Sequence, residues 1–74
     1  MYILMMVQHT KSGDVIAPAL GYETVDAWKA KYHQEMAYAM ANDDFLGLSV
    51  LVTDGSLHTV FADNWVREVA EAGE

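Results

Sequence analysis

Two segments of the chain are apolar at odd and even positions alike. Residues 2–9 carry two such rows, which are Ile3, Met5, Val7 and His9 on one side and Tyr2, Leu4, Met6 and Gln8 on the other. Residues 45–53 carry Leu46, Leu48, Val50 and Val52 on one side and Phe45, Gly47, Ser49 and Leu51 on the other. Large apolar and β-branched residues favour extended structure. Because a strand that is apolar on both faces is covered on both sides, these segments are predicted to be the central strands of a sheet.

Two further segments are predicted to be the outer strands. Residues 15–22 follow the turn-forming run at 11–14, and they contain Pro18, which has no amide hydrogen and is therefore confined to sheet edges. Residues 57–62 follow the pair Asp54-Gly55, which is typical of tight hairpin turns. Each outer strand is expected to form a hairpin with the central strand that precedes it.

Residues 25–41 show a helical pattern. Thr24 is the predicted N-cap, and the run Asn42-Asp43-Asp44 is expected to end the helix. At about 100° per residue, one narrow stripe forms the predicted core face, and it consists of Val25, Trp28, Tyr32, Met36 and Ala39. The opposite side is rich in alanine, which would let another helix or sheet approach closely.

These elements predict an α+β fold with strand-strand-helix-strand-strand order. The sheet is expected to be four-stranded and antiparallel, in the order 2-1-3-4, with the helix on one face. After the fourth strand, Asp63 is predicted to cap a helical turn, and residues 71–74 are expected to fray. Seventy-four residues suffice for a single domain, 1–74.

One helix can cover only one face of this sheet, although both central strands are apolar on the other face too. A domain of about 60 residues buries only about 60% of the surface of its unfolded chain. The chain has no cysteine, so no disulfide can add stability. We therefore expect a homo-oligomer that covers the second face. The alternative is a sheet that curls and covers itself.

Charge and hydropathy exclude two classes of partner. Eleven acidic and four basic residues give a net charge of -7, which repels nucleic-acid backbones. The apolar residues 1–7 have no basic flank and are followed by Gln8 and His9, so they are predicted to be neither a membrane span nor a signal peptide. We expect a cytoplasmic protein.

The sequence shows no motif for catalysis or for metal binding. His9, His33 and His58 lack metal-ligand spacing. The serines have no Gly-x-Ser-x-Gly elbow, and no glycine-rich phosphate loop is present. We expect a protein that is not an enzyme and uses no cofactor or metal.

Basic and aromatic residues occur together at Lys29 and His33 and again at Trp65 and Arg67. Aromatic rings stack on nucleobases, and cationic groups bind phosphates. These four residues are therefore the candidate site for a small anionic nucleotide, if they converge within the chain or across an oligomer interface. The alternative is that Trp65 closes one end of the sheet and the lysines form a solvated rim.

Three stretches resemble a family of short, uncharacterised proteins encoded by phages and prophages. They are the Tyr32-His33-Gln34-Glu35-Met36-Ala37 element, the Asp54-Gly55 hairpin and the Trp65-Val66-Arg67 segment. The resemblance implies a compact fold, a location in the host cell and no known activity. It favours an accessory binding protein that forms an oligomer and sequesters a small nucleotide immune signal. The alternative is an interaction or structural module that binds a host or phage protein.

Overall fold

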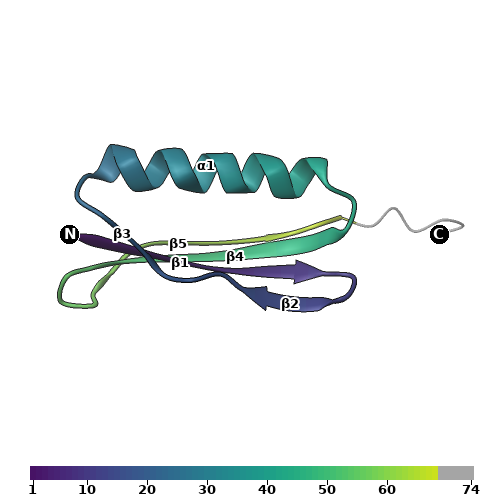
Figure 1. The fold of residues 1–74 in the computed structure, drawn as a ribbon, viewed down its shortest axis with the longest axis horizontal. Helices are drawn as coiled ribbons and strands as arrows, with labels where there is room; N and C mark the ends of the chain where they lie inside the picture. Colours follow the sequence, from purple (N-terminus) through teal and green to yellow (C-terminus); the bar gives the residue numbers. More distant parts are fainter. Residues whose placement is uncertain (69–74) are drawn as a thin grey trace, which may run out of the picture.

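The computed structural model describes residues 1–68 and contains one helix packed on one face of an antiparallel sheet (Figure 1). The strands are β1 (Tyr2–Thr10), β2 (Gly13–Ile16), β3 (Leu20–Tyr22), β4 (Phe45–Asp54) and β5 (Thr59–Val66), and the helix is α1 (Val25–Ala41). The α+β class and the single helix on one face agree with the sequence prediction. The predicted fraying of residues 71–74 lies outside the described residues.

The sheet has five strands, so the prediction of four was wrong in detail. Its order is β2-β1-β4-β5, and β3 pairs separately with β1. The sequence predicts one edge strand at residues 15–22, but the pairing stops after Ala17, whose amide donates to the Met6 carbonyl at 3.1 Å. Pro18 has no amide hydrogen with which to continue the ladder. With β2 and β3 taken as two halves of one edge strand, the predicted order 2-1-3-4 holds.

The hydrophobic core lies between α1 and the side of the sheet that faces it. Three of its side chains, Leu4, Leu48 and Val52, are fully buried, and each contributes about 1.5–3 kcal/mol by leaving water. Trp28 of α1 packs between two rings of the sheet. The ring centroids of Tyr2 and Phe61 lie 6.4 and 5.3 Å from that of Trp28. The rest of the core consists of Met6, Met36, Ala39, Phe45 and Val50.

Local signals set the ends of α1. The Thr24 side chain accepts a hydrogen bond from the Ala27 amide at 3.2 Å, which confirms it as the N-cap. The predicted core stripe is buried or half-buried except at Val25, which is 36% exposed and was predicted wrongly. Helical side chains lean toward the helix N-terminus. The Trp28 indole therefore covers the part of the sheet beneath the first turn, and Val25 is left at the rim of the core.

The first two residues of β4 have exchanged sides relative to the prediction, which placed Leu46 in one row with Leu48 and Phe45 in the other row with Ser49. Phe45 is buried, and its ring meets that of Tyr38 on α1 at 5.5 Å, whereas Leu46 is 39% exposed. The cause is an irregularity in the β1–β4 register between His9 and Thr10. An extra residue at such a bulge reverses the alternation of side chains.

Strand β5 continues to Val66, so the predicted helical turn capped by Asp63 was wrong. Asp63 lies opposite Val50 in the β4–β5 ladder, and Trp65 lies opposite Leu48. Positions 61, 63 and 65 are half-buried and positions 62, 64 and 66 are exposed. This alternation keeps aromatic residues under α1, and the packing outweighs the turn preference of Asp63 and Asn64.

Candidate functional site

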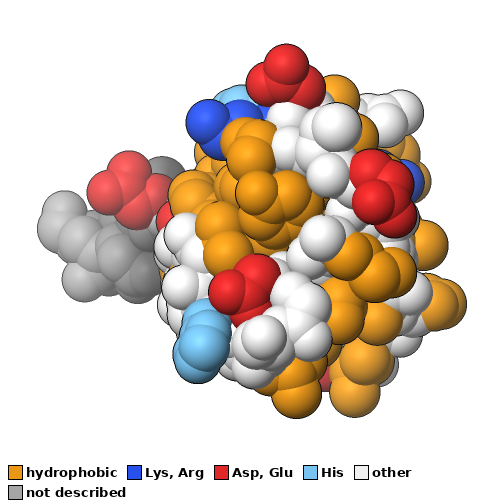
Figure 2. All heavy atoms as spheres, turned by 90° about the vertical axis from the view of Figure 1, so that its left-hand side faces the viewer, with side chains coloured by type: hydrophobic (Ala, Val, Ile, Leu, Met, Phe, Trp, Pro, Cys, Tyr) orange, Lys and Arg blue, Asp and Glu red, His pale blue; other side chains and the backbone are white. Residues whose placement is uncertain are grey.

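The side of the sheet away from α1 has no covering element within residues 1–68 (Figure 1). We call it the open face. Strand alternation and register place on it Ile3, Met5, Val7 and His9 of β1, Asp14 and Ile16 of β2, Gly47, Ser49, Leu51 and Thr53 of β4, and Ala62, Asn64 and Val66 of β5. Of these, only His9 and Asp14 are ionisable. The β1 side chains of this face are half-buried, and Thr53 is buried at 4% exposure. Seen from the end where α1 begins, hydrophobic side chains continue to the lower edge of the molecule, away from the helix (Figure 2).

A shallow apolar groove of about 630 Å³ crosses the open face. Its lining includes Met5, Val7 and Leu51 of the central strands together with Ile16 and Pro18. The Ile16 side chain is 78% exposed. Exposed, contiguous apolar surface of this kind marks interaction sites in soluble proteins.

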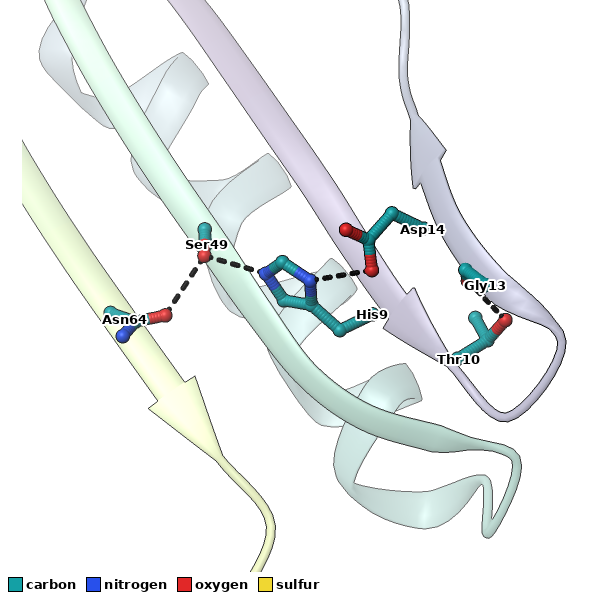
Figure 3. Close-up of polar contacts among 6 residues, drawn as sticks. All are labelled: His9, Thr10, Gly13, Asp14, Ser49 and Asn64. Atoms are coloured by element: carbon teal, nitrogen blue, oxygen red, sulfur yellow. Dashed lines mark hydrogen bonds and ion pairs between the residues drawn. The ribbon is translucent and has the colours of Figure 1, made fainter.

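Four polar side chains form a continuous hydrogen-bonded row across the same face (Figure 3). We call Asp14, His9, Ser49 and Asn64 the polar row. The Nδ1 atom of His9 lies 2.9 Å from Oδ1 of Asp14, and its Nε2 atom lies 2.9 Å from Oγ of Ser49. Oγ of Ser49 lies 2.8 Å from Oδ1 of Asn64. The row therefore links β2, β1, β4 and β5.

Strand register brings these four residues together. His9 is paired with Asp14, and Ser49 is paired with Asn64. The residue directly opposite His9 on β4 is Gly47. A Cβ atom at Gly47 would lie 3.5 Å from Cδ2 of His9 and 2.7 Å from the Trp65 carbonyl oxygen. The absence of a side chain there gives the imidazole room to lean toward Ser49.

The polar row has two consistent arrangements of protons. A doubly protonated His9 donates to Asp14 and to Ser49, and the Ser49 hydroxyl then donates to the Asn64 carbonyl oxygen. A neutral His9 donates from Nδ1 to Asp14 and accepts the Ser49 proton at Nε2, which requires the Asn64 amide to turn and donate to Ser49. The hydrogen bond from His9 to Asp14 keeps its direction in both arrangements, and the charge of His9 sets the direction of the other two, between His9 and Ser49 and between Ser49 and Asn64.

An aspartate, a histidine and a serine in this order also resemble the hydrogen-bonded set of a serine hydrolase. No sequence pattern near Ser49 indicates a base beside it, because His9 is 40 positions away and the contact depends on register. Ser49 lies inside a central strand, where its main-chain amide belongs to the sheet ladder. Such an amide is not free to stabilise an oxyanion. Ser49 and His9 therefore have the contact expected of a nucleophile and its base. The Ser49 amide, however, is not available as an oxyanion donor.

Lys29 and His33, two of the four predicted ligand residues, lie exposed on α1. The His33 ring stands 4.9 Å from the ring of Tyr32. The Tyr32 hydroxyl donates to the Asp63 carboxylate, and this hydrogen bond raises the pKa of Tyr32 to about 12, with burial adding to the effect. This part of α1 is therefore joined to β5 by a structural hydrogen bond.

Trp65 and Arg67, the other two, lie together at the end where α1 finishes. The Arg67 guanidinium stands 5.1 Å from the centre of the Trp65 ring. Its Nε donates to the Phe45 carbonyl at 2.7 Å, and its Nη2 donates to carbonyls at the end of α1. Lys29 is ten residues before Ala39 on the helix, or roughly 15 Å along its axis. The structure thus groups the four residues as two separate pairs within the chain.

Neither the rest of the described structure nor a comparison with known proteins adds another candidate site. Within residues 1–68, no group of three or more histidine, cysteine or acidic side chains is placed to hold a metal ion. No helix in that range is long and apolar enough to cross a bilayer. Comparison with protein-family models, with curated proteins and with solved structures found no match. The likeness to short phage-encoded proteins therefore stays a prediction.

Proposed function

We propose that the protein is a non-enzymatic binding protein whose working form is a homodimer, in which the open face of one copy docks on the open face of another. The observation that carries this proposal is the composition of that face. It carries a row of apolar side chains along β1, flanked by Ile16 of β2 and Leu51 of β4. The two ionisable residues that the strands place on it, His9 and Asp14, already contact each other. Although the chain has a net charge of -7, the strands place no other ionisable side chain on this surface.

The size of the open face also suits a second copy. Strand β1 has nine residues, which at about 3.4 Å each span roughly 30 Å, and four strands about 4.8 Å apart span roughly 19 Å. The plan area is thus on the order of 600 Å², and pleats and side chains raise the accessible area toward the roughly 800 Å² per partner of a specific interface. Two sheets packed in this way form a sandwich with a shared second core.

Such a dimer would present two copies of α1 and an acidic outer surface to the cell. In the setting that the phage likeness implies, we propose that this surface meets a basic host or phage protein. This is the interaction-module alternative from the sequence. Sequestration of a small nucleotide is the less favoured candidate, because the Arg67 guanidinium already donates to main-chain carbonyls. A thermal-shift screen against cyclic nucleotides and ADP-ribose derivatives separates the two, since only a nucleotide binder is stabilised.

Two neighbouring residues of β2 give a matched test of the dimer. Ile16 lies on the open face, and Val15 is its neighbour on the opposite side of the same strand; both are exposed. Ile16→Glu should convert a dimer of about twice 8.2 kDa into a monomer in sedimentation equilibrium, and Val15→Glu should leave the dimer unchanged. A wild-type protein that is monomeric at micromolar concentration contradicts the proposal.

A further inference from the structure

The polar row has two chemically different ends. At the β2 end, one oxygen of Asp14 contacts His9, and the other has no hydrogen-bond partner within residues 1–68. At the β5 end, Oδ1 of Asn64 contacts Ser49, which leaves the amide Nδ2 hydrogens without a partner in the same range. An unused acceptor with negative charge thus lies at one end, and an unused pair of donors lies at the other (Figure 3).

Two sheets can dock face to face with two-fold symmetry in two simple ways. If the axis runs across the strands and lies directly over the polar row, each residue of the row faces its own counterpart, and the two Asp14 carboxylates meet. If the axis runs along the strands, between β1 and β4, the two rows run in opposite directions and Asp14 faces Asn64 of the partner. An isologous interface makes each such contact twice.

Charge distinguishes these arrangements. Burying two carboxylates against each other is unfavourable, and a buried charge without a hydrogen-bond partner is costly. An amide that donates to a carboxylate removes both problems and forms a charge-assisted hydrogen bond. His9 and Ser49 lie on the two strands that flank the second axis, so the hydrogen bond between them would lie close to that axis.

Building on the proposed homodimer, we propose that its two-fold axis runs along the strands between β1 and β4, and that Asn64 of each copy donates to Asp14 of the other. The partner copy therefore completes the polar row at both ends. The apolar positions around the row supply the burial, and the row fixes the register and direction of docking.

A charge exchange tests the pairing. Asn64→Asp places a carboxylate opposite Asp14 of the partner twice, so the dissociation constant should rise by about tenfold per contact, or on the order of a hundredfold in all. The double variant Asp14→Asn with Asn64→Asp restores an amide opposite each carboxylate. It should dimerise within about tenfold of the wild type. Sedimentation equilibrium measures all of these constants.

The other axis gives the opposite result for the double variant, because two aspartates at position 64 would then face each other and the dimer would stay weak. Under that axis, Asp14→Asn alone would strengthen the dimer. Either result overturns the proposal. Since the chain has no cysteine, cross-linking gives an independent measurement: a mixture of Asp14→Cys and Asn64→Cys proteins should form a mixed disulfide dimer, and Asp14→Cys alone should not.

The two proposals fail in different ways. If Ile16→Glu is monomeric but the charge exchange does not restore the dimer, the open face is the interface and the proposed axis is wrong. If the wild type itself is monomeric, the homodimer fails and the pairing fails with it.

Discussion

Nη2 of Arg67 lies 2.9 Å from the carbonyl oxygen of Ala39, although the two residues are 28 positions apart. The same nitrogen is 3.1 Å from the Met40 carbonyl and 3.0 Å from the Asn42 carbonyl. The last carbonyls of a helix have no partner within it, and they carry its negative dipole end. Since α1 has no basic residue in its last turn, Arg67 supplies the capping charge from the segment after β5.

Arg67→Ala should therefore lower the free energy of unfolding by about 2–3 kcal/mol, because it removes the charge-assisted hydrogen bonds to these carbonyls. The Ala39 and Asn42 carbonyls would keep only the amides of Asn42 and Phe45. Arg67→Lys should recover only part of this, since a point charge cannot reproduce the guanidinium fork. Urea denaturation followed by circular dichroism measures both. If Arg67→Ala unfolds at the wild-type midpoint, the contact is not structural and the residue becomes available as a ligand group.

Tyr32 and Asp63 give a pH-dependent prediction. The hydrogen bond to Asp63 raises the pKa of Tyr32 to about 12, whereas an unfolded tyrosine titrates near 10. A raised pKa means that the folded state holds the proton more tightly, so this stabilisation is complete below about pH 10 and is lost as the pH rises toward 12. Absorbance of the tyrosinate in a pH titration should show one tyrosine that titrates late.

Tyr32→Phe should remove this late transition and cost about 1 kcal/mol through the lost hydrogen bond. Asp63→Asn is the matched variant, because it keeps an acceptor but removes the charge, and it should lower the pKa of Tyr32 toward the value of about 10 for an unfolded tyrosine. An unchanged late transition in Asp63→Asn would show that burial, and not the carboxylate, is the main cause.

The hairpin between β4 and β5 gives a prediction at acid pH. Asp54 accepts hydrogen bonds from the amides of His58 and Ser56 at 3.0 and 2.8 Å, and these lower its pKa, the His58 amide most. A lowered pKa stabilises the folded state above the unfolded pKa of about 4, and this is lost as the pH falls through the folded value. Chemical-shift titration should find the Asp54 midpoint below the value of about 4 for an unfolded aspartate.

Much of the fold could be predicted because it depends on local signals. Thr24 and Asn42 bound the helix, Asp54-Gly55 marks a hairpin, and alternation marks the central strands. The errors came from longer-range effects. The bulge beside His9 exchanged the faces of Phe45 and Leu46, and no local pattern near position 45 indicates it.

The candidate site was harder to predict than the fold for the same reason. The contact between His9 and Ser49 exists only once the register of β1 and β4 is fixed. Arg67 reaches the end of α1 only because β5 continues to Val66, which the turn-forming pair Asp63-Asn64 argues against. Sequence reasoning identified the open face as apolar, but it could not show that its few polar residues form one row.

Gly47 gives the most direct test of how the polar row is built. A methyl group at this position would lie 2.7 Å from the Trp65 carbonyl oxygen, which is main-chain and cannot move without shifting β5. It would also touch the His9 ring, which leans over this position toward Ser49. Gly47→Ala should therefore cost about 1–3 kcal/mol of stability by overpacking, and it should disturb the His9 to Ser49 hydrogen bond.

The matched control is Gly55→Ala, because a methyl group there meets no atom within 4 Å and its backbone does not adopt a positive φ. This variant should unfold at nearly the wild-type urea concentration. Histidine ring resonances in NMR spectra of Gly47→Ala should show a change at His9 and none at exposed His58. Equal stability of the two alanine variants would mean that β5 can shift freely, and that Gly47 does not position the polar row.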